Sequence, residues 1–282
     1  MEKLDFERNE NGNVVCDQNG EKKQSFVQFR PLETKKMIYK CEKHGEVSCE
    51  VLILNGSLIN PYCPICEQEE EKRRQEKEEE NRKEREREEQ IQRYKEMNIE
   101  KEYWNKSIDD YIPQCEAQKK AQDAVRRLIE KKHGKVILLG NNGCGKSHLG
   151  NAAVSALGGK VLTVYEVNAM IRQSYSMLAK KTELEIVEEL ASTPMLFLDE
   201  FGRVKGSKFN ADWMSFVLDK RHQRGLPFML AGNGHLRRDC PKGAEHCEDC
   251  FENYLGEDIL SRLRQDTEVI TMYNAPDYRR RK

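Results

Sequence analysis

The chain has 282 residues, of which 37% are hydrophobic and 34% are charged, and its formal net charge at pH 7 is −1. This length predicts about two domains, and the near-zero charge means that any nucleic-acid surface must be local. The sequence contains no apolar run of about 18 residues and no signal-peptide centre, so we expect a cytoplasmic protein without membrane contact. Thiols stay reduced in that compartment, so the ten cysteines point to metal binding rather than to disulfides.

The segment 1–66 is predicted to be a zinc-binding module. It contains two ligand pairs, Cys41-x-x-His44 and Cys63-x-x-Cys66. A two-residue gap lets both side chains of a pair reach one tetrahedral ion from a tight turn, and a thiolate-rich site without an open position favours Zn²⁺. Cys49 is an alternative fourth ligand in place of His44. Little apolar material surrounds these residues, so the metal should supply much of the folding free energy.

The segment 67–97 is predicted to be a charged linker. Of the 24 residues in 67–90, 20 are charged and none is apolar. Opposite charges recur at helical spacing, as in Glu78 and Arg82, and such pairs support a helix. No apolar stripe is present that could bury a coiled-coil seam. A solvated single helix and a disordered tether both fit this pattern, and either one makes the segment a spacer.

The segment 98–282 has a globular composition in which apolar strands alternate with helices. Such alternation predicts an α/β fold with a doubly wound parallel sheet. We expect strands at Lys135–Gly140, Val161–Tyr165, Met195–Leu198 and Phe228–Ala231. We expect helices at Ala121–Lys131, after the glycine-rich loop, and at Val167–Lys180, Leu184–Ala191, Ala211–Arg224 and Asp258–Arg264.

A complete phosphate-binding loop follows the first of these strands. It reads Gly140, Asn141, Asn142, Gly143, Cys144, Gly145, Lys146 and Ser147, with His148 next in the helix that follows. The glycines let backbone N–H groups curl around phosphate oxygens, and the helix directs its positive end at the same anion. Lys146 can reach the β and γ phosphates of ATP, and Ser147 offers a hydroxyl to Mg²⁺. ATP binding is therefore the firmest functional prediction.

Two further strand ends add candidate catalytic groups. The strand that begins at Met195 ends in Asp199, which is placed to hold Mg²⁺, and in Glu200, which is the candidate to polarise the attacking water. The next strand ends at Asn233, whose amide could touch the γ-phosphate or the water. With the phosphate loop, these groups predict an ATPase.

This order of elements resembles the AAA+ ATPases, and specifically the DnaC-like helicase loaders and the related IstB-type transposition ATPases. The resemblance covers about residues 98–282, from NIEKEYWNKSIDDY through GNNGCGKSHL, LFLDEFG and AGN to ILSRLR and PDYR. It implies a three-layer P-loop fold with a parallel sheet and no C-terminal lid. It further implies that Asn233 is a sensor and that Arg262 is an arginine finger. The opening segment of the resemblance, residues 98–111 (NIEKEYWNKSIDDY), would lie near the adenine. Glu100 stands where the family often has proline, which leaves the adenine contacts open.

The resemblance also implies partners. As a loader, the protein would bind a hexameric replicative DNA helicase and single-stranded DNA, and it would self-assemble through the ATP site; the zinc module would dock onto the helicase. An IstB-type transposition ATPase is the alternative. A third reading, a zinc-dependent interaction protein with a slow nucleotide switch, is disfavoured because Lys146, Asp199, Glu200 and Arg262 occur together. The local bases that could contact DNA are Arg203, Lys205, Lys208, Arg237 and Arg238.

A second cysteine cluster interrupts the stretch between Asn233 and Arg262. Cys247-x-x-Cys250 resembles half a zinc site, which Cys240 and His246 could complete. A polar loop with incidental cysteines is the alternative.

Overall fold

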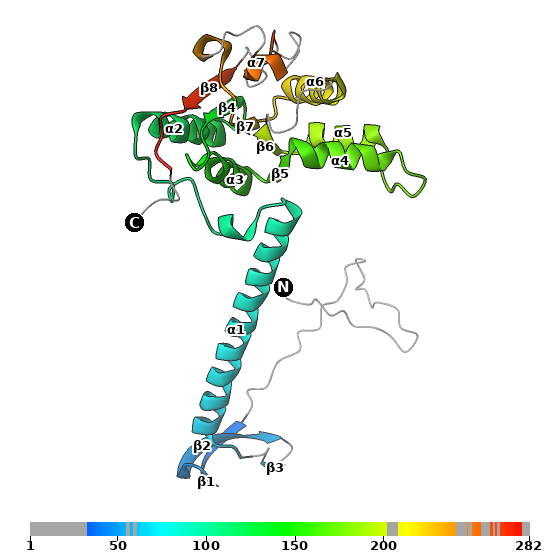
Figure 1. Ribbon diagram of the computed structural model, residues 1–282. Coiled ribbons are helices and arrows are strands. Elements are labelled where there is room, and N and C mark those ends of the chain that lie inside the picture. The colour runs from blue at the N-terminus through cyan, green and yellow to red at the C-terminus, as the bar shows by residue number, and fades with distance from the viewer. Residues whose placement is uncertain are drawn as a thin grey trace, which may run out of the picture. The chain divides into compact units, whose positions relative to one another are not determined.

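The computed structural model describes residues 33–54, 57–58, 61–201, 208–240, 247, 250–254, 260–261, 263 and 266–277. The chain divides into two compact units, Met1–Glu84 and Arg85–Lys282 (Figure 1). In the part of the chain that the structure describes, no helix combines the length and the apolar character needed to cross a membrane.

The first unit contains a small antiparallel sheet and the start of a long helix. The strands β1 (Glu33–Cys41), β2 (Gly45–Leu54) and β3 (Ser57–Leu58) lie in the order β1-β2-β3. The turn between β1 and β2 reverses at Gly45, whose φ of 74° suits a residue without a Cβ. Helix α1 spans Pro64–Glu96 and begins with proline. Proline fits the first helical position because the N–H that it lacks would have no partner within the helix there.

Helix α1 carries the charged linker, so of the two alternatives for this segment the structure shows the helix. The helix starts three residues before the expected linker, and Cys66 therefore lies in its first turn. Tyr94 near its other end is buried and stacks on Trp104, with ring centroids 5.7 Å apart.

The second unit is built on a five-stranded parallel sheet with the order β5-β6-β7-β4-β8. Neighbouring strands that are distant in sequence, such as β4 and β7, require crossover helices, which cover both faces of the sheet. The strands are β4 (Lys135–Gly140), β5 (Gly159–Thr163), β6 (Met195–Phe201), β7 (Phe228–Gly232) and β8 (Thr267–Met272).

Alternate residues of the central strands enter two separate cores. Ile137 and Leu196 pack with α4, α5 and α6 on one face of the sheet, whereas Leu138 and Phe197 pack with α2 and α3 on the other (Figure 1). The helices are α2 (Glu116–Lys131), α3 (Lys146–Leu157), α4 (Val164–Ser174), α5 (Glu183–Ser192), α6 (Lys208–Gln223) and α7 (Phe251–Tyr254), with short 3₁₀ turns η1 (Lys101–Tyr103) and η2 (Arg237–Asp239). The expected three-layer α/β fold with a parallel sheet is confirmed.

Three element assignments were wrong. The helix expected at Val167–Lys180 spans Val164–Ser174. The strand expected at Val161–Tyr165 ends at Thr163, because Thr163 and Glu166 form a reciprocal capping box that starts α4. The edge strand β8 was not predicted, since Thr267 and Glu268 interrupt its apolar pattern and its register with β4 is set by the tertiary fold. Most of the helix expected at Asp258–Arg264 lies outside the described residues.

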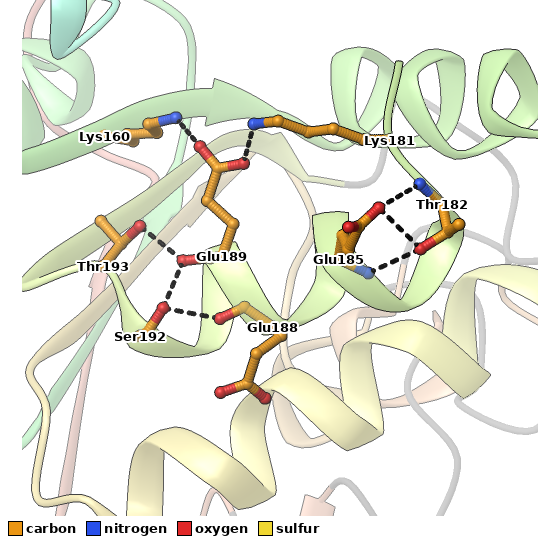
Figure 2. Close-up of polar contacts among 8 residues, drawn as sticks. All are labelled: Lys160, Lys181, Thr182, Glu185, Glu188, Glu189, Ser192 and Thr193. Carbon is orange, nitrogen blue, oxygen red and sulfur yellow. Dashed lines mark hydrogen bonds and ion pairs between the residues drawn. The ribbon is translucent and has the colours of Figure 1, made fainter. Parts of the chain in front are cut away.

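Helix α5 is held beside β5 by a carboxylate shared between two lysines. Glu189 on α5 accepts hydrogen bonds from Lys160 of β5 and from Lys181 in the loop before the helix (Figure 2). At the start of the helix, Thr182 and Glu185 form a second capping box. The two lysine contacts lower the pKa of Glu189, with the Lys160 hydrogen bond as the larger cause.

We expect the substitution Glu189→Gln to destabilise the protein at neutral pH but not in acid. The folded-state pKa lies below the unfolded value of about 4.3, so the stabilisation is present above that value and is lost as the pH falls through the folded pKa. The variant should lose about 1 kcal/mol of unfolding free energy at pH 7. Urea unfolding of parent and variant at pH 7 and at about pH 3 checks this, and an equal difference at both values would contradict it.

Candidate nucleotide and metal sites

The phosphate-binding loop joins β4 to α3 at the carboxyl edge of the sheet. Gly143 and Gly145 have φ values of 81° and 95°, which side chains with a Cβ rarely adopt. A Cβ on Gly145 would also lie 2.3 Å from Cε2 of Tyr111. Helix α3 begins at Lys146, so its unpaired N–H groups and positive dipole end face the loop. The loop therefore has the conformation that an anion requires.

Two side chains outside the motif hold the loop from behind. The Tyr111 hydroxyl donates to the Cys144 carbonyl at 2.8 Å, and the Gln118 amide donates to the same carbonyl and to that of Pro276, both at 3.3 Å. Both side chains are buried. Sequence reasoning missed the role of Gln118, because a lone glutamine on a helix carries no signal. Tyr111 belongs to the Asp-Tyr of the opening segment, which was singled out only for the adenine.

Lys146 and Asn233 meet in the middle of the site. The Lys146 ammonium donates to the carbonyls of Gly140 and Asn141 at 2.8 and 2.9 Å and to Oδ1 of Asn233 at 3.0 Å. The Asn233 amide nitrogen donates to Oδ1 of Asn142 at 2.8 Å. The end of β7 is thus tied to the phosphate loop through one buried cation.

Asp199 and Glu200 lie near the end of β6, beside Ser147. Burial raises the pKa of Asp199, while hydrogen bonds from the Ser147 hydroxyl and the Glu200 N–H oppose the rise. The Glu200 N–H lies 2.7 Å from Oδ1 of Asp199. Glu200 is exposed and has a φ of 54°, a left-handed conformation that is rare for a residue with a side chain. Strained backbone of this kind clusters at functional sites.

These groups line a single cleft with a volume of about 310 Å³. Its walls include the phosphate loop, both acids and Asn233, together with Glu102, Tyr103 and Lys106 from the opening segment. Tyr103 offers an aromatic face, and the Lys106 ammonium lies 5.7 Å from its ring centroid. The opening segment thus forms part of the wall of the candidate nucleotide cleft.

His148 forms part of the cleft wall as a neutral imidazole. Burial lowers its pKa below the usual value of about 6.5, so the ring is uncharged at pH 7. Its Nε2 lies 3.1 Å from the Ser107 carbonyl and donates a hydrogen bond to it. The ring edges of Tyr103 and Tyr111 pack against it, with centroids 6.4 and 5.5 Å away.

The chain is similar to curated replicative helicase loaders named DnaC. It is 24% identical over 185 residues to the loader of Escherichia coli strain K12, a match that covers 63% of this chain and 70% of the loader. The loader of Buchnera aphidicola subsp. Acyrthosiphon pisum is 25% identical over 186 residues, again covering 63% and 70% of the two chains. The resemblance to the DnaC-like helicase loaders is confirmed.

A crystal structure of the DnaC helicase loader superposes with a TM-score of 0.48 and 20% identity, covering 61% of this chain and 99% of that one. A DnaI crystal structure gives a TM-score of 0.48 and 21% identity over 62% of this chain and 95% of that one. No family model matches the chain.

The chain has a cysteine–histidine cluster in its first unit. Cys41, His44, Cys63 and Cys66 each direct one ligand atom to a common point, with these atoms within 4.8 Å of one another. The Cys41 and Cys66 sulfurs are 3.5 Å apart, and Nδ1 of His44 lies 3.3–3.8 Å from the three sulfurs. Ligands at Zn–S and Zn–N distances of about 2.3 and 2.0 Å form a tetrahedron with edges of roughly 3.4–3.8 Å. The donor set and its spacing therefore fit Zn²⁺.

Neighbouring groups prepare this cluster for a metal. The backbone N–H groups of His44 and Lys43 lower the pKa of the Cys41 thiol to about 6, which favours the thiolate. Nε2 of His44 lies 3.4 Å from a carboxylate oxygen of Glu69, which also binds the Lys43 ammonium. A carboxylate on the second ring nitrogen is the usual device that orients a histidine ligand. Cys49 is buried elsewhere, opposite Met37 in the β1–β2 ladder.

A second cluster lies after β7, and it includes a histidine that the sequence did not indicate. His235 joins Cys240, Cys247 and Cys250, with the four ligand atoms within 4.8 Å of one another. His246 lies outside the described residues. So do Arg262 and two of the candidate DNA-binding bases, Arg203 and Lys205, as well as the side chain of Lys208. Arg237 donates through Nε to Asn253 at 2.8 Å, and Arg238 is 72% exposed.

Proposed function

We propose that the protein is an ATP-dependent loader of a replicative DNA helicase. The similarity to the DnaC loaders, 24% identity over 185 residues, carries the proposal. The cleft supports it, because a phosphate loop, an aspartate–glutamate pair and Asn233 line one cleft of about 310 Å³. In this proposal ATP binding favours assembly with the helicase on single-stranded DNA, and hydrolysis releases the partner.

The phosphate loop, the two acids and Asn233 would each have a part in ATP hydrolysis. The loop N–H groups and Lys146 bind the phosphates, and Ser147 and Asp199, already hydrogen-bonded to each other, are placed to hold Mg²⁺. The ion would neutralise charge on the phosphate oxygens. Glu200 would polarise the attacking water, and Asn233 would hold the γ-phosphate or the water through the amide that now bonds to Lys146.

Three parts of the proposal rest on the resemblance. Arg262 would act on the ATP of a neighbouring copy, so that the cleft becomes complete on self-assembly. The Zn²⁺ module at the N-terminus would dock onto the helicase. Single-stranded DNA would contact basic side chains of the second unit. Of Arg237 and Arg238, Arg238 is the better candidate, because its side chain is exposed whereas Arg237 is hydrogen-bonded to Asn253.

A loading assay with a purified hexameric replicative helicase of the same organism tests the function. With ATP, the chain should place the helicase on a closed circular single-stranded DNA, from which it does not dissociate during gel filtration. Lys146→Ala should abolish loading, because it removes the cation that binds the phosphates. Lys119→Ala, which changes an exposed lysine on α2, should load like the parent.

If the chain did not bind the helicase in the presence of ATP, of ADP or of no nucleotide, the proposed loader function would be overturned. An IstB-type transposition ATPase is the second candidate, favoured by the same ATPase core. It would be supported if the chain, with ATP, instead formed a complex with a transposase on duplex DNA.

A further inference from the structure

We propose that His235, Cys240, Cys247 and Cys250 bind a second Zn²⁺ ion as a structural site within the ATPase unit. Three thiols and one imidazole converge there, with Sγ of Cys247 3.4 Å from Nε2 of His235 and all four ligand atoms within 4.8 Å. Three thiolates and a histidine without a carboxylate or an open position favour Zn²⁺ over harder ions. The proposal does not depend on helicase loading.

The backbone around the cluster brings together ligands from three separate places in the chain. His235 follows β7 and forms a parallel bridge with Cys250, and the Phe251 N–H donates to the His235 carbonyl at 2.7 Å. The Cys250 N–H donates to the Cys247 carbonyl at 3.2 Å, which closes the tight turn that a two-residue ligand gap needs. Cys240 ends the 3₁₀ turn η2.

Side-chain hydrogen bonds hold the ligand-bearing segments to one another. The Asn253 amide nitrogen donates to the Cys247 carbonyl at 2.8 Å, and its oxygen accepts from Nε of Arg237 at 2.8 Å. The Arg237 N–H donates to the Glu252 carboxylate at 2.8 Å. Both sides of the cluster are therefore positioned by groups that are not ligands, as expected for a metal site rather than for incidental cysteines.

Two of these thiols are buried, unlike the thiols of ordinary surface cysteines. Cys247 and Cys250 are 5% and 0% exposed, although the segment around them is short of apolar residues. Elsewhere in the described second unit, Cys115 and Cys144 stand singly and belong to no such group. Three thiols at one point are expected for a metal site more than for packing, because the free energy of metal binding contributes to folding.

The site lies next to the two strand ends that carry the nucleotide groups. His235 comes two residues after Asn233, and the carbonyl of the intervening Gly234 accepts from the Tyr273 hydroxyl at 3.0 Å. Phe251, the residue after Cys250, packs on Phe201 of β6 with ring centroids 5.3 Å apart. A metal here would therefore fix the segment after β7 against the edge of the sheet where Asn233 and Glu200 lie.

The test is the zinc content of the full chain, purified without chelators and measured by elemental mass spectrometry against protein concentration. The parent should hold about two zinc ions per chain. The double variant Cys63→Ser/Cys66→Ser should retain about one, because it removes ligands of the N-terminal cluster only. This variant leaves the residues of the second site intact, so loss of all zinc in it would overturn the proposal.

Variants of the second site identify its ligands. Cys247→Ser/Cys250→Ser and His235→Ala should each remove about one zinc ion, whereas the control Cys115→Ser should remove none. His246→Ala should also remove none; if it did remove one and His235→Ala did not, the ligand set would be wrong. In hydrogen exchange, Cys247→Ser/Cys250→Ser should speed exchange of the Phe251 N–H, while Cys63→Ser/Cys66→Ser should leave it unchanged. Unchanged zinc content in the second-site variants would overturn the site.

Discussion

The substitution Glu200→Gln should lower ATP turnover by a factor of about 10²–10⁴ and leave ATP binding nearly unchanged. Glu200 lines the cleft at the exposed end of β6, where a carboxylate can take a proton from water attacking the γ-phosphate. Glutamine has the same shape and the same backbone preferences, so it keeps the left-handed φ of 54° but cannot accept the proton. In the proposed function the loop and Lys146 bind the phosphates, and the substitution does not touch them.

Phosphate release at saturating ATP measures the turnover, and titration with a fluorescent ATP analogue measures the binding. Glu130→Gln is the matched control, because Glu130 is an exposed glutamate on α2, away from the cleft. It should change neither quantity. If Glu200→Gln turned over ATP at the parent rate, the water would be activated by another group and the assignment of Glu200 would be wrong.

The residues of the candidate nucleotide cleft could be predicted from the sequence because their positions follow a general rule of parallel sheets. The phosphate loop and Asn233 follow β4 and β7, Asp199 and Glu200 lie near the end of β6, and the carboxyl ends of parallel strands lie at one edge of the sheet. The order β5-β6-β7-β4-β8 then places the strand ends of β6, β7 and β4 side by side. A short motif and an apolar run suffice to predict each of these positions.

Groups that act through tertiary contacts could not be predicted in this way. Gln118 supports the phosphate loop from 26 positions away, and only the packing of α2 against α3 brings its amide to Cys144. His235 and His246 both offer suitable ligand chemistry near Cys247. The choice between them depends on the bridge from His235 to Cys250, which is a property of the folded chain. Ligand spacing alone therefore indicated a cluster but did not indicate His235.

Arg221 is a further buried group that no motif indicated. Its side chain is 1% exposed, and its guanidinium donates to the carbonyls of Leu190 at 2.8 Å, Thr193 at 2.6 Å and Pro194 at 3.1 Å, and to that of Pro227. Leu190 and Thr193 belong to the C-terminal end of α5, where the last carbonyls of a helix have no partner within it. Burial lowers the pKa of Arg221 to about 9, so the group stays charged at neutral pH.

The substitution Arg221→Met should therefore destabilise the ATPase unit strongly. Methionine keeps most of the apolar stem but leaves four carbonyl oxygens without their donors, at about 1–3 kcal/mol for each that stays buried and unpaired. Partial relaxation reduces the sum, and we expect a loss on the order of 4 kcal/mol, or a fall in Tm of about 10 °C. Arg221→Lys should give a smaller loss, because an ammonium retains the charge but cannot span four acceptors.

Arg224→Met is the matched control for Arg221→Met. Arg224 lies one turn further along, is 36% exposed, and pairs with Glu188, so its loss should cost at most about 1 kcal/mol. Calorimetric unfolding of the three variants and the parent, with and without ATP, gives the comparison. ATP should raise Tm in all four proteins, because Arg221 touches none of the groups that line the cleft. Equal losses for Arg221→Met and Arg224→Met would mean that the four carbonyls find other donors, and that the buried guanidinium does not hold α5 to the start of β6 and β7.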